Sequence, residues 1–129
     1  KVARRTIFFI WRTFGVEALM AAYNDSEEWL EELKQYLFDN YNYLRAYFSE
    51  YLPEFPVSML EGTYLVWVDC SVLNQSSDEI VKTLLEKEKL WVNEGSLYGE
   101  IGEGFIRINI ACPRQQLIEG LNRLRRALK

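Results

Sequence analysis

Histidine is absent from this chain, and cysteine occurs only twice in its 129 residues, at Cys70 and Cys112. Without histidine, no catalytic arrangement can use an imidazole as its base, and a zinc site lacks its commonest nitrogen ligand. Two cysteines are too few for a disulfide framework. We therefore expect both to be reduced and buried, as is usual in a cytoplasmic protein.

Long apolar runs and an excess of positive charge are missing as well. The apolar run from Ile7 to Trp11 is far too short to span a bilayer, and no signal-peptide pattern surrounds it. The formal net charge is −4, so we expect neither a nucleic acid nor a membrane as partner. The hydrophobic fraction of 49% is enough for one domain of this length to bury a core.

Two capping-box spacings predict where helices begin. Asp25 followed by Glu28 predicts the start of a long helix, and Ser76 followed by Glu79 predicts the start of another. From Asp25 to Tyr51, apolar residues recur at steps of three and four and cover more than one face, so this helix is expected to have neighbours on two sides. We assign its aromatic residues to core packing. The other predicted helices are 16–23, which follows an interruption at Gly15, and a final one through 117–128.

Alternation with a period of two predicts the strands. Ile106 and Ile108 share one face of a strand from Phe105 to Ile110, and Arg107 lies on the other. The remaining predicted strands are 57–60 and 63–69, joined by a hairpin turn at 61–62, and 89–93. Because both faces of 63–69 are apolar, we expect it to be the central strand, followed by a right-handed crossover to 89–93. The sequence predicts an α+β fold in which helices pack on a small mixed or antiparallel sheet.

Arg107 is the one residue with a distinct chemical role. It follows a loop with four glycines in ten residues, 95, 99, 102 and 104, which indicates sharp turns or a close approach to another group. A guanidinium on a strand face can hold a carboxylate or a phosphate through two parallel hydrogen bonds. Without that loop, an exposed arginine on a solvated sheet face would be the simpler interpretation. No other motif of a catalytic centre is present, and we predict no metal site.

Three segments carry a family resemblance: 14–30 (FGVEALMAAYNDSEEWL), 61–69 (EGTYLVWVD) and 102–114 (GEGFIRINIACPR). Together they resemble the C-terminal part of fold-type-I pyridoxal-phosphate enzymes of aminotransferase class I/II. Within that group, the chain is most similar to the cystathionine β-lyases of the MalY/PatB type. The likeness runs from about Phe14 to Leu128.

The resemblance implies that 25–129 is a C-terminal small domain of the pyridoxal-phosphate-dependent transferase fold, and that 1–24 connects it to a missing large domain. In that family the arginine of this strand binds the α-carboxylate of the amino-acid substrate, which implies the same role for Arg107. The lysine and other residues that hold pyridoxal phosphate belong to the large domain. We therefore expect the cofactor in the complete enzyme and none on this chain alone.

Several interpretations stay open. In the first, the chain is part of a pyridoxal-phosphate-dependent C–S lyase or aminotransferase and is inactive by itself; the start at Lys1 favours this one. In the second, it is a stand-alone, non-catalytic binding or interaction module with the same fold, and in the third it is a reading frame without activity. In each case the apolar residues from Ile7 to Met20 lead us to expect a homo-oligomer such as a dimer.

Overall fold

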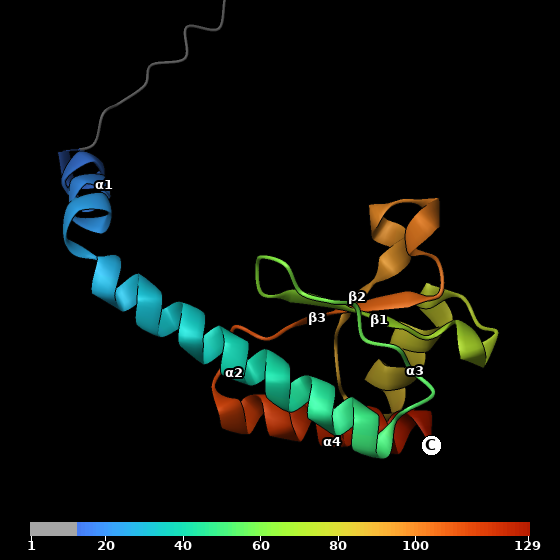
Figure 1. Cartoon of the computed structure of the whole chain (residues 1–129). Helices are drawn as coiled ribbons and strands as arrows, with labels where there is room; N and C mark the ends of the chain where they lie inside the picture. The colour runs from blue at the N-terminus through green and yellow to red at the C-terminus, as the bar shows by residue number, and fades with distance from the viewer. Residues whose placement is uncertain (1–12) are drawn as a thin grey trace, which may run out of the picture. The chain divides into compact units, whose positions relative to one another are not determined.

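The computed structural model describes residues 13–129 and contains four α-helices and three β-strands in that range (Figure 1). The helices are α1 (Thr13–Asp25), α2 (Glu27–Tyr51), α3 (Ser77–Glu88) and α4 (Arg114–Leu128). The strands are β1 (Leu65–Asp69), β2 (Asn93–Glu94) and β3 (Phe105–Asn109), with short 3-10 turns η1 (Ser71–Leu73), η2 (Gly95–Tyr98) and η3 (Glu100–Gly102). The predicted α+β class is confirmed. The chain divides into two compact units within α2, after Gln35.

The first unit comprises α1 and the start of α2, and it differs from the prediction at both helix starts. Gly15 lies inside α1, because one glycine costs a helix only about 1 kcal/mol and good helix formers follow it. Asp25 is the last residue of α1, and α2 begins at Glu27, so the capping box predicted at Asp25 is wrong. Ser26 separates the helices, and its carbonyl accepts the Leu30 N–H at 3.0 Å. The segment Ile7 to Trp11 lies outside the described residues.

The second unit is built on an antiparallel sheet in the order β1-β3-β2. β3 is therefore the central strand, and the prediction that 63–69 is central is wrong. The segment beside the outer edge of β1 forms only an isolated bridge, Val57 to Val68, in place of the predicted strand 57–60. Pro56 lacks an N–H, although its carbonyl still accepts the Asp69 N–H at 2.9 Å.

The strand predicted at 89–93 is replaced by the two-residue strand β2, Asn93–Glu94, and 89–92 lie outside it. Lys89 is the C-cap of α3 with φ 53°, and the Leu90 N–H donates to the Leu84 carbonyl at 3.2 Å. These residues therefore finish the helix before the strand can begin. At the other end of α3 the predicted capping box is confirmed, since Ser76 Oγ accepts the Glu79 N–H at 3.2 Å and Glu79 Oε2 accepts the Ser76 N–H at 3.0 Å.

The α-helices of this unit lie on one face of the sheet, and the short turns η2 and η3 lie on the other (Figure 1). Along β3, Ile106 and Ile108 point into the core, as predicted, while Arg107 lies on the opposite face. The core also takes fully buried side chains from β1 and from each helix of this unit: Val66, Val68, Leu44, Ile80, Leu84, Leu121 and Leu124. Arg107 is thus held at the middle of the central strand, on the face opposite the α-helices.

The two cysteines are free; Cys70 is fully buried, whereas Cys112 is half-buried. Burial, with a smaller contribution from the Asp69 carboxylate, raises the pKa of the Cys70 thiol to about 12. Burial also raises the pKa of Cys112. Within residues 13–129, no helix is long and apolar enough to cross a membrane.

Candidate functional site

Arg107 lies between two cross-strand partners at the centre of the sheet. The register pairs it with Trp67 of β1 on one side and with Asn93 of β2 on the other. The alternation predicted from the sequence holds along β3, because buried and half-buried residues follow one another from Phe105 to Ile108. Regular pairing on both sides fixes the direction in which the Arg107 side chain leaves the strand.

The guanidinium of Arg107 makes one contact of note with the described residues. Its Cζ lies 4.2 Å from the centroid of the Tyr98 ring, which is well within the range of a cation–π interaction. Its Nε is buried and has no hydrogen-bond partner in the described part of the chain. A buried donor that is left unpaired is unusual in a native structure.

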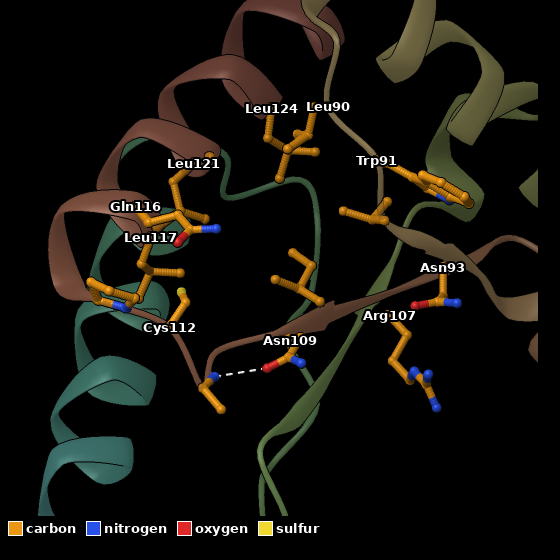
Figure 2. Close-up of a pocket in the computed structure, with 15 residues that line it drawn as sticks. Leu90, Trp91, Asn93, Arg107, Asn109, Cys112, Gln116, Leu117, Leu121 and Leu124 are labelled. Atoms are coloured by element: carbon orange, nitrogen blue, oxygen red, sulfur yellow. Dashed lines mark hydrogen bonds between the residues drawn. The ribbon is translucent and has the colours of Figure 1, made fainter.

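A cavity of about 430 Å³ extends from Arg107 to α4. Figure 2 shows Arg107 and Asn93 at one end of it, with Leu117, Leu121 and Leu124 of α4 at the other. Of the fifteen residues that line the cavity, Arg107 is the only charged one. Its rim also carries the side-chain amides of Asn93, Asn109 and Gln116. The site thus offers one positive charge and several neutral donors to a ligand, and no acidic or lysine side chain.

The end of β3 is locked to α2 and α4 by the buried amide of Asn40. Its Nδ2 donates to the carbonyls of Ile110 at 2.8 Å and Cys112 at 3.0 Å, and its Oδ1 accepts from Arg114 Nε at 2.8 Å. The Tyr36 hydroxyl accepts the Arg114 N–H at 2.8 Å. Our sequence reasoning did not identify Asn40. The available signal was a polar residue inside the apolar seam of the long helix.

The glycines before β3 let the chain pack tightly against itself. A Cβ on Gly95 would lie 2.1 Å from the Gly102 carbonyl oxygen, and one on Gly102 would lie 2.1 Å from that of Gly95. Gly99 has a φ of 111°, which few other residues adopt. Ser77 holds the end of this loop, because its Oγ accepts the Gly104 N–H at 2.8 Å. The close approach predicted from the glycines is therefore between two parts of the same loop, which carries Tyr98.

The described residues contain no group of three or more acidic or cysteine side chains that could hold a metal ion. No lysine of residues 13–129 lines the cavity: for example, Lys87 Nζ donates to the Ala127 carbonyl at 3.4 Å and Lys34 pairs with Glu31. The residues that line the cavity therefore present one cation and bring together no nucleophile and base.

The family model for aminotransferase class I and II matches residues 1–124. Protein MalY of Escherichia coli K12 is 38% identical over 115 residues, and cystathionine beta-lyase PatB of Bacillus subtilis 168 is 37% identical over 115 residues. Both alignments cover 89% of this chain and 30% of the relative.

Among solved structures, a PLP-bound putative aminotransferase from Clostridium difficile 630 matches with a TM-score of 0.87 and 41% identity. The match covers 90% of this chain and 30% of that one. This chain thus spans about 30% of the length of these relatives. The resemblance found in the sequence is confirmed, and so is the predicted relation to the pyridoxal-phosphate-dependent transferase fold.

Proposed function

This chain belongs to the aminotransferase class I and II family, and on that basis we propose that it is the C-terminal part of a pyridoxal-phosphate-dependent enzyme that acts on amino acids. Residues 25–129 would form its small domain, and 1–24 would connect them to a large domain. The relatives include a protein named as a cystathionine β-lyase and one named as a putative aminotransferase. Both match about nine-tenths of this chain, so the proposal includes C–S lyase activity and aminotransferase activity.

The guanidinium of Arg107 supports this proposal most directly. It lies on the face of the sheet opposite the α-helices, and its Nε has no hydrogen-bond partner in the described residues. The α-carboxylate of an amino acid can accept two parallel hydrogen bonds from such a group. That contact would fix the orientation of the amino group and of the Cα–H bond before the reaction. The same orientation serves elimination and transamination, so Arg107 does not distinguish between them.

The described residues do not by themselves fit pyridoxal phosphate. No lysine lines the cavity beside Arg107 to form an imine with the cofactor, and no carboxylate is there to pair with its ring nitrogen. We therefore assign this chain no step on the cofactor. Its part is to bind the substrate carboxylate, to orient the substrate, and to line the wall of the cavity with apolar side chains.

Expression of the complete reading frame that contains this chain tests the proposal. We expect the purified protein to contain pyridoxal phosphate and to release pyruvate from cystathionine, or to transfer the amino group of an amino acid to a keto acid. The 129-residue chain should do neither under the same conditions. A complete frame that carries no cofactor lysine and no such activity would overturn the proposal in favour of a stand-alone binding module.

A further inference from the structure

We propose that Tyr98 is the positioning residue for Arg107: its ring supports the guanidinium, so that the two terminal nitrogens meet the substrate carboxylate in a fixed orientation. The proposal rests on the function proposed above for Arg107. It extends that function to a second residue, which lies in the glycine loop and bears no charge.

The contact between the two residues stands out among those of the same kind. Cation–ring distances for other arginines of the described chain are longer, at 4.9 Å for Arg114 over Tyr43 and 4.8 Å for Arg125 over Tyr51, against 4.2 Å for Arg107 over Tyr98. Arg114 also donates a hydrogen bond to Asn40. Arg107 Nε has no such polar partner in residues 13–129, so the contact with the ring is what holds the head group.

The Tyr98 ring is itself held in place. Trp67 meets it edge to face, with ring centroids 5.4 Å apart and an interplanar angle of 81°. Trp67 is the residue of β1 directly opposite Arg107, so the sheet register places the indole beside the guanidinium and the ring together. The backbone of the loop is fixed by the tight packing of Gly95 against Gly102. Tyr98 is thus supported from the strand and from the loop at once.

This arrangement explains which donors of Arg107 are available. The buried Nε is shielded from solvent, so the carboxylate would use the terminal nitrogens. A long side chain that is already held in its binding conformation loses less entropy when the ligand arrives. The phenolic hydroxyl has no hydrogen bond to the described residues, and nearly half of the Tyr98 side chain is exposed (47%). The ring face is therefore what matters, and the hydroxyl is not needed.

The test compares Tyr98→Leu with Tyr98→Phe in the complete enzyme. Loss of the ring should raise KM for α-amino acids about 2- to 30-fold, the range of a cation–π contact, with a smaller change in kcat. The phenylalanine variant should restore the wild-type KM. Leu97→Ala is the matched control, because Leu97 is an exposed neighbour in the same turn. In an Arg107→Ala background, Tyr98→Leu should have no further effect on KM.

A spectroscopic measurement on the 129-residue chain reports the contact independently of activity. The side-chain protons of Arg107 should show an upfield ring-current shift in NMR, which Tyr98→Phe retains and Tyr98→Leu or Tyr98→Met removes. The proposal is overturned if the shift is absent in the wild type, or if Tyr98→Leu raises KM equally with and without Arg107. If Arg107→Ala itself leaves KM unchanged while the shift is present, the proposed function of Arg107 fails and the contact stands.

Discussion

Arg114 and Asn40 are 74 residues apart in the sequence, yet Arg114 Nε donates to Asn40 Oδ1 at 2.8 Å. The same amide holds the carbonyls of Ile110 and Cys112, so one buried side chain joins α2, the end of β3 and the start of α4. The position of Arg107, three residues before Ile110, depends on that junction.

Replacing Asn40 with alanine should therefore destabilise the fold. The change leaves two carbonyl groups and a guanidinium N–H without a partner, and each buried group that is left unpaired costs about 1–3 kcal/mol. We expect the free energy of unfolding in urea to fall by about 2–4 kcal/mol. Gln115→Ala, at an exposed position in α4, is the control and should change it by less than about 0.5 kcal/mol. Equal stability of both variants would contradict the role assigned to Asn40.

Arg107 should matter for activity and little for stability. In the complete enzyme, Arg107→Ala should lower kcat/KM for α-amino acids about 100- to 1,000-fold, because two charge-assisted hydrogen bonds are lost. Lysine should rescue poorly, since it lacks the planar fork. The free energy of unfolding of the 129-residue chain should fall by no more than about 0.5–2 kcal/mol, the contribution of the contact with the Tyr98 ring, because Nε has no hydrogen bond to lose. A strongly destabilised Arg107→Ala chain would indicate a structural role.

The glycine loop predicts a contrast between two alanine substitutions. A methyl group on Gly95 would meet backbone oxygens at 2.1 and 2.8 Å, whereas one on Gly62 has no neighbour within 4 Å. Overpacking of this kind costs about 1–3 kcal/mol or more, so Gly95→Ala should lower the melting temperature by several degrees. Gly62→Ala should leave it nearly unchanged. Thermal denaturation of the two variants under the same conditions measures this difference. Similar melting temperatures would contradict the tight packing.

Stability should fall in alkaline solution because of Cys70. Burial raises the pKa of its thiol to about 12, so between its unfolded value and pH 12 the unfolded chain loses the proton and the folded chain keeps it. That difference lowers the free energy of unfolding by about 1.4 kcal/mol per pH unit over this window. Unfolding curves from pH 8 to 11 should show a shallower decline for Cys70→Ala than for the wild type. Parallel declines would mean that Cys70 is not the group responsible.

Self-association is expected through the first unit of the chain. Phe14, Tyr23 and Trp29 are exposed by 90%, 84% and 62%, which is far more apolar surface than such a short segment normally leaves in water. Sedimentation at low micromolar concentration should show dimers or larger species. Trp29→Glu and Tyr23→Glu should shift the population toward monomer. A wild-type chain that sediments as a monomer throughout would contradict the prediction.

The sequence predicted features that depend on local pattern. The capping box at Ser76, the alternating faces of β3 and the α+β class all follow from spacings of two to four residues. The order of the strands could not be predicted from such spacings. Apolar residues on both faces of 63–69 suggested a central strand, but β1 lies at the edge of the sheet, and a proline-containing segment covers its outer side with a single bridge.

Only part of the candidate site was predicted from the sequence. Arg107 was found from its strand and its glycines, and the family resemblance gave it a role. Tyr98 and Asn40 were missed because their contacts join residues that no local periodicity connects. Tyr98 reaches Arg107 through the fold of a loop, and Asn40 reaches Arg114 through the packing of two helices.

The short β2 has a consequence for how copies of this chain can aggregate. β2 pairs with β3 only at Arg107 and Ile106, so the last positions of β3 have no partner strand on that side. There the Asn109 side chain accepts the Ala111 N–H at 2.8 Å, and Pro113 follows. The opposite edge of the sheet is covered by the segment that contains Pro56. Neither edge offers a long row of free amides to a strand from another molecule. Fibril growth by strand addition is therefore disfavoured in this sheet, and copies that associate must do so through side-chain packing.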